Sequence, residues 1–130
     1  MNYVAIGAAT VVGMVLGALW YSPVLFANQW MRCIGKTKEM LGSPTWPMIG
    51  SVFACILTAV GVAILHNIIG VGSLEQALTV GLLLGSLIIF PAFLSDSLFC
   101  GWGAQLLLIQ VGYRFLSVVL MSVVIYIIGT

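Results

Sequence analysis

The sequence predicts an all-α membrane protein with four transmembrane helices in one domain, residues 1–130. Hydrophobic residues make up 62% of the chain and charged residues only 5%. Soluble domains carry about a quarter charged residues, so this composition cannot build a water-facing surface. The apolar stretches are also too long for membrane β-strands and do not alternate with polar residues. Each is close to the length of about 20 residues that a helix needs to cross a bilayer.

The first predicted span covers about residues 3–21. Pro23 should end it, because the residue before a proline is pushed out of helical geometry. Residues 24–34 then mix apolar side chains with Asn28, Gln29 and Arg32. That mixture is typical of a short amphipathic helix in the headgroup region. The polar stretch 35–47 that follows is predicted to be a water-exposed loop.

Three further spans are predicted at about residues 46–69, 74–90 and 104–128. A tight turn joins the second to the third, and Ser73 is the expected N-cap of the third helix. Pro91 should disturb that helix and begin a second short interfacial segment.

An internal repeat relates the two halves of the chain, about residues 1–70 and 71–130. Residues 9–26 and 77–94 agree at 7 of 18 positions, including the proline, Pro23 or Pro91, at which each apolar run ends. The predicted fold is therefore two parallel-repeat helical hairpins, with short interfacial helices after Pro23 and Pro91.

Small residues recur four apart in both copies of the repeat. This spacing places them on one helix face, where small side chains let helix backbones approach closely in a membrane. We expect these faces to pack the first span against the third, or two copies of the chain in a homodimer. The alternative is a substrate path lined by bare backbone. The residues are Ala9, Gly13, Gly17, Ala77, Gly81 and Gly85.

The basic residues predict the orientation of the chain in a bacterial inner membrane. Arg32, Lys36 and Lys38 lie between the first two spans, and the segments expected on the other side carry no Lys or Arg. The positive-inside rule then places the 24–46 connection in the cytoplasm and both termini outside. All four tryptophans fall at the predicted inner interface.

Arg114 is the most unusual residue, because it lies about ten residues into the fourth span. A guanidinium at such depth costs at least about 2.5–3.5 kcal/mol on insertion scales. Gln110 and Ser117 share its helix face, and Asp96 is the acid expected on the same side of the membrane. These four residues form the candidate intramembrane polar site. One hypothesis pairs Arg114 with Asp96 in an ion pair that joins the last two spans; the other leaves Arg114 free for an anion or headgroup.

Several kinds of chemistry are not expected. The net charge of +1 lacks the clustered cations that nucleic acids require. Cys33, Cys55 and Cys100 form no metal-binding motif, and His66 is the single histidine. The sequence holds no phosphate-binding loop, nucleophile motif or paired carboxylates, so we expect no catalytic residues, metal or cofactor, and no enzyme.

The segment LGALWYSPVLFANQW, residues 16–30, resembles a bacterial family of small membrane proteins called domain-of-unknown-function family 1761. SDSLF, residues 95–99, and VGYRF, residues 111–115, match later parts of the same family. The resemblance covers essentially the whole chain and implies four spans with no assigned activity. This chain departs from the family pattern at Asp96, which is often an amide, and at Arg114, which is often histidine.

These observations predict a small integral membrane protein whose partners are the lipid bilayer and a second copy of itself. It would act by binding a lipid, a small ligand or a membrane partner. The alternative function is a dimeric transporter or channel that uses Arg114 to conduct a small solute or anion.

Overall fold

A computed structural model describes residues 2–129, and its regular elements are all helical. Four long segments are each long and apolar enough to cross a membrane, as expected of a multi-pass membrane protein. The helices are α1 (Tyr3–Trp20), α2 (Ala27–Ile34), the 3-10 helix η1 (Lys38–Leu41), α3 (Thr45–Ile69), α4 (Leu74–Leu84), the π-helical segment η2 (Gly85–Ile89), α5 (Phe90–Cys100) and α6 (Ala104–Ile128).

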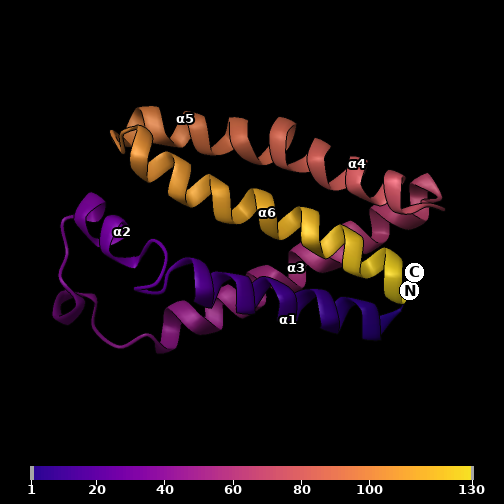
Figure 1. Ribbon diagram of the computed structural model, residues 1–130, viewed down its shortest axis with the longest axis horizontal. Helices are drawn as coiled ribbons and strands as arrows, with labels where there is room; N and C mark the ends of the chain where they lie inside the picture. Colours follow the sequence, from indigo (N-terminus) through magenta and orange to yellow (C-terminus); the bar gives the residue numbers. More distant parts are fainter. Residues whose placement is uncertain (1, 130) are drawn as a thin grey trace.

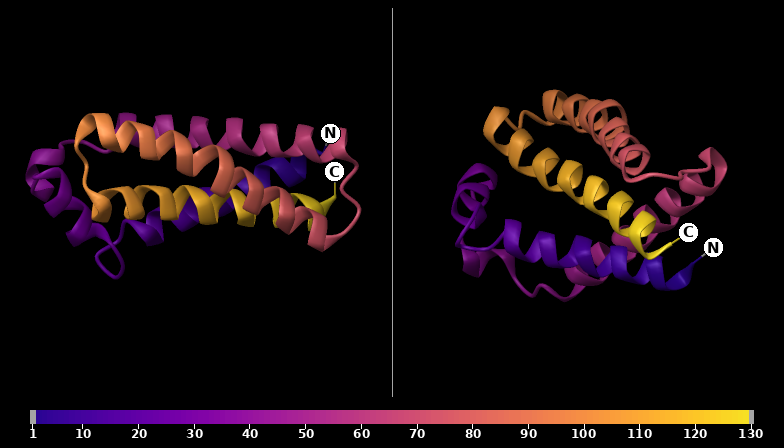
Figure 2. Two further views of the ribbon diagram at one scale, coloured as in Figure 1. Left: turned by 90° about the horizontal axis from the view of Figure 1, so that it is seen from above. Right: turned by 45° about the vertical axis from the view of Figure 1, so that its right-hand side comes forward.

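Helix α6 occupies the centre of the bundle, between α1 on one side and the α4–α5 segment on the other (Figure 1). Helix α3 packs against both α1 and α6. The two termini lie together at one end, which we call the termini end, whereas α2 and the α5–α6 turn lie at the other, which we call the α2 end (Figures 1 and 2). Helices α1 and α4 therefore both run from the termini end to the α2 end.

The third span does not end at Phe90 as predicted, because the helix continues without a break to Cys100. Pro91 has no N–H to donate and crowds the carbonyl one turn earlier. The helix accommodates it by widening over Gly85–Ile89, where the N–H of Phe90 donates to the carbonyl of Gly85, five residues back. Pro91 thus lies inside a continuous helix, whereas Pro23 lies in the turn between α1 and α2.

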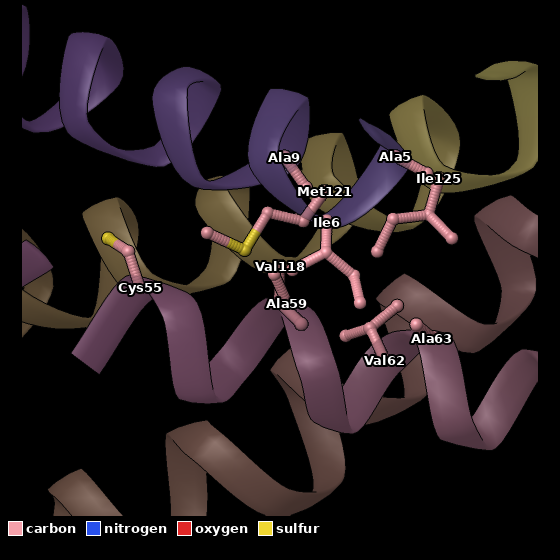
Figure 3. Close-up of a cluster of buried hydrophobic side chains, with 10 residues drawn as sticks. All are labelled: Ala5, Ile6, Ala9, Cys55, Ala59, Val62, Ala63, Val118, Met121 and Ile125. Atoms are coloured by element: carbon pink, nitrogen blue, oxygen red, sulfur yellow. The ribbon is translucent and has the colours of Figure 1, made fainter. Parts of the chain in front are cut away.

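The hydrophobic core fills the half of the bundle nearer the termini end. Small side chains from α1 and α3 let these helices approach closely, and Met121 and Ile125 of α6 fill the space between them (Figure 3). The cluster comprises Ala5, Ile6, Ala9, Cys55, Ala59, Val62, Ala63, Val118, Met121 and Ile125.

The glycines of both repeat copies face α6 rather than each other. A Cβ on Gly81 would lie 2.7 Å from the Cα of Val119, and one on Gly85 would lie 2.5 Å from the Phe115 ring. On α1, a Cβ on Gly17 would lie 3.0 Å from the hydroxyl of Tyr113. Helix α6 therefore covers both glycine faces. The first and third spans do not pack against each other through these faces as predicted, but each packs against the fourth.

The turns that connect the spans follow local sequence signals. The hydroxyl of Ser73 accepts a hydrogen bond from the N–H of Gln76, which confirms the predicted N-cap of α4. Gly35 ends α2 and Gly70 ends α3, each with φ in the left-handed region that glycine adopts without strain.

Candidate ligand cavity

A cavity of about 520 Å³ lies at the α2 end of the bundle, beyond the hydrophobic core. Its walls come from the second half of α1, α2, the first turns of α3, α5, the α5–α6 turn and the first half of α6. The lining residues are Met14, Gly17, Ala18, Tyr21, Trp30, Pro44, Pro47, Met48, Ser51, Phe93, Trp102, Gln110, Tyr113 and Arg114.

Arg114 is the charged residue of this lining. It lies ten residues from Ala104, which corresponds to about 15 Å along the helix at 1.5 Å per residue. Side chains of a helix lean toward its N-terminus, so Arg114 leans toward the α2 end, where the cavity lies. Its Cζ atom lies 5.0 Å from the centroid of the Tyr113 ring, a cation–π contact that partly offsets the cost of burying the charge.

Gln110 lies one helical turn from Arg114, nearer the α2 end. Its Oε1 atom accepts a hydrogen bond of 2.7 Å from the hydroxyl of Tyr21. With that oxygen engaged by a donor, the group that Gln110 offers to the cavity is its amide N–H₂, which can only donate.

Aromatic rings surround these polar groups and pack edge to face. The ring of Tyr21 lies 5.5 Å from that of Trp30 and 5.7 Å from that of Tyr113. Across the cavity, Phe93 lies 6.3 Å from Trp102. The hydroxyl of Tyr113 donates to the carbonyl of Gly13 at 2.9 Å, which fixes its ring between α1 and α6. Such contacts hold the wall in one arrangement.

Of the predicted polar site, the structure brings Gln110 and Arg114 together in the cavity and places the other two residues elsewhere. Ser117 is 5% exposed and lies against the glycine face of α1, outside the cavity lining. Asp96 is exposed on α5, is not among the lining residues, and forms no ion pair with Arg114 within 4.0 Å. Arg114 therefore does not pair with Asp96 in the structure, and its side chain lines a cavity instead.

The aromatic wall of the cavity is not predicted by the sequence patterns described above. Tyr21 and Trp30 lie in the segment LGALWYSPVLFANQW, and Tyr113 precedes Arg114 in VGYRF. The signal was therefore present in the same motifs that carry the family resemblance. Aromatic residues at a membrane interface, however, are expected there whether or not they line a cavity.

The lining of the cavity carries one positive charge, that of Arg114. Among the described residues, those that line the cavity include no Asp or Glu. The same described part of the chain contains no group of three or more His, Cys, Asp or Glu residues that could hold a metal ion. The arrangement can therefore donate hydrogen bonds to an oxyanion and contact an apolar or aromatic group beside it.

The fold and the cavity define a class of small multi-pass membrane proteins with four spans and an arginine-containing cavity at one end. The family described as "Protein of unknown function (DUF1761)" matches residues 4–126, nearly the whole chain, and the chain belongs to this family. No curated protein and no solved structure matches the chain.

Proposed function

We propose that this protein binds a small ligand or lipid within the membrane, in the cavity at the α2 end. The single observation that carries the proposal is the position of Arg114, a permanently charged side chain in a transmembrane helix, in the wall of that cavity. A charge inside the membrane is expensive and usually functional. The volume of about 520 Å³ also lies within the range of small-molecule sites, about 300–1,000 Å³.

The basic residues of the 24–46 connection support a location of the cavity at the cytoplasmic side of a bacterial inner membrane. Arg32 and Lys36 lie at the α2 end, and Lys and Arg are enriched in cytoplasmic loops. In this orientation both termini lie outside, and a ligand enters from the cytoplasm or from the inner leaflet.

Transport through a single copy has less support. A solute that leaves the cavity toward the termini end would have to pass the core cluster, in which Ala9 and Ile125 are fully buried. A transport cycle would therefore need the contacts of α1 with α6 to open. The predicted homodimer remains a prediction, and because α6 occupies the glycine faces, a second copy would have to use another surface.

Quenching of tryptophan fluorescence tests the proposal, because Trp30 and Trp102 line the cavity. The protein in dodecyl maltoside micelles would be titrated with three brominated amphiphiles: ω-bromodecanoate, ω-bromodecanol and ω-bromodecylamine. We expect saturable quenching by at least one of them. Quenching that rises linearly with all three, as simple partition into the micelle predicts, would contradict the proposal.

A pair of matched substitutions locates the binding. Ser51→Phe places a large ring in the cavity, whereas Ser86→Phe makes the same change on the exposed face of η2. We expect Ser51→Phe to abolish saturable quenching and Ser86→Phe to leave it unchanged. Equal effects of the two substitutions would place the binding outside the cavity.

A further inference from the structure

We propose that the ligand of this cavity is an amphiphile with one anionic headgroup, whose oxyanion binds Arg114 and Gln110 and whose chain extends into the bilayer past the first turns of α3. This inference rests on the proposed function and specifies the chemical class of its ligand. It follows from the polar groups that the cavity leaves available and from the side on which its wall is exposed.

The first step concerns hydrogen-bonding capacity. Most polar groups of the wall are already engaged: the hydroxyl of Tyr21 donates to Gln110 and that of Tyr113 donates to Gly13. The groups left to a ligand are mainly donors: the guanidinium of Arg114, the amide of Gln110 and the indole N–H groups of Trp30 and Trp102, with the Ser51 hydroxyl able to donate or accept. A site composed of donors around one positive charge selects an oxyanion, and the planar guanidinium fits a carboxylate or phosphate with two parallel hydrogen bonds.

The second step concerns the position of the donors along α6. Arg114 and Gln110 are four residues apart and lie on one face of the helix, with Gln110 nearer the α2 end. Tyr21 adds a hydroxyl beside Gln110. An acid group at Arg114 would therefore lie below the membrane interface, at the end of a row of polar groups that begins there. A ligand with an apolar chain can bring its acid group to this depth, because the chain stays in apolar surroundings and the donors of the site offset the cost of burying the charge.

The third step concerns the exit of the chain. Met48 lines the cavity and is also 52% exposed on α3. Since α3 is a predicted span with a mean hydropathy of 2.4, we expect the exposed side of Met48 to face lipid. The cavity would then open toward the bilayer at Met48, and an alkyl chain could lie across Met48 while the acid group reaches Arg114.

Two amphiphiles that differ only in the headgroup test the charge on the wild-type protein. We expect ω-bromodecanoate to bind about 10- to 100-fold more tightly than ω-bromodecanol, since a hydrogen bond to a charged group contributes about 1.5–3 kcal/mol and 1.4 kcal/mol is tenfold in affinity. Equal saturable binding of acid and alcohol would overturn the anionic headgroup but leave the proposed function intact. Absence of saturable binding by either probe and by the amine would contradict the proposed function itself.

Substitution of the arginine tests the same point independently. Arg114→Gln should remove the preference for the acid, and Arg114→Lys should retain part of it because the positive charge remains. Arg32→Gln removes an equal charge from exposed α2, outside the cavity, and should leave binding unchanged. If Arg114→Gln fails to fold, the comparison of acid with alcohol on the wild type still decides the question.

Soluble anions distinguish a membrane amphiphile from a free metabolite with the same oxyanion chemistry. Acetate and inorganic phosphate would compete against ω-bromodecanoate in the wild type. We expect neither to displace it at concentrations similar to its own, because the chain contributes to binding through the apolar area it buries. Displacement by acetate or phosphate at such concentrations would show that the site takes a soluble anion, and would overturn the assignment to an amphiphile.

Discussion

The Nε2 atom of His66 lies 2.8 Å from the hydroxyl oxygen of Ser122, deep in the bundle near the termini end. The same hydroxyl donates to the carbonyl of Ala77 at 2.6 Å. His66 and Ser122 are both at most 1% exposed. This chain of hydrogen bonds joins α3, α6 and α4 beside the hydrophobic core.

The arrangement predicts the tautomer of His66. A hydroxyl has one hydrogen, and Ser122 uses it on the carbonyl of Ala77, so its oxygen must accept from His66. The neutral ring therefore carries its proton on Nε2, which leaves Nδ1 as a buried acceptor without a hydrogen-bond partner among the described residues. Nitrogen-15 chemical shifts of the ring will show this tautomer, and the assignment is simple because the chain has one histidine. A proton on Nδ1 would contradict the inferred direction of the bonds.

Removal of the hydroxyl should destabilise the fold. Ser122→Ala leaves the N–H of His66 buried and unpaired, which we expect to lower the free energy of unfolding by about 1–3 kcal/mol. The matched control is Ser86→Ala, because the Ser86 hydroxyl is exposed and donates only within its own helix, to the carbonyl of Leu82. Unfolding in mixed micelles measures both. A loss no larger than that of the control would mean that the network does not stabilise the fold.

The contact between α4 and α6 should depend on the absence of a side chain at Gly81. A methyl group there would lie 2.7 Å from the Cα of Val119, and backbone cannot move aside as a flexible side chain can. We expect Gly81→Ala to destabilise the protein by about 1–3 kcal/mol through overpacking. Gly13→Ala should do so less, because its methyl would meet the mobile end of Met121.

Gly61→Ala is the control for this prediction. Gly61 lies within α3 with nothing within 4 Å of the added methyl group, so only helix propensity acts there. That substitution should be neutral or stabilise by up to about 1 kcal/mol. If Gly81→Ala behaves like Gly61→Ala in the same unfolding assay, the close approach of α4 to α6 is wrong.

The spans could be predicted because length and hydropathy alone decide them, and the helices at 3–20, 45–69 and 104–128 reflect that. The helix that packs against each glycine face could not be predicted. The spacing of Gly13 and Gly81 indicates a close helix contact but does not indicate which helix makes it. Pro91 predicts a helix end by sequence alone, but the wider turns of η2 accommodate this proline inside a continuous helix. The partner of Arg114 cannot be predicted either, because an acid on the same side of the membrane, Asp96, says nothing about the direction in which its side chain points.

The proposed orientation of the chain predicts which cysteine an impermeant reagent reaches. Cys100 is exposed at the end of α5, at the α2 end, whereas Cys55 is 1% exposed in the core. In a variant whose sole cysteine is Cys100, a charged maleimide should label inside-out vesicles and not intact spheroplasts, since the basic 24–46 connection favours a cytoplasmic α2 end. A Gly72→Cys variant of the cysteine-free protein, in the exposed α3–α4 turn, should show the reverse pattern. Labelling of Cys100 in spheroplasts would invert the predicted topology and place the mouth of the cavity outside the cell.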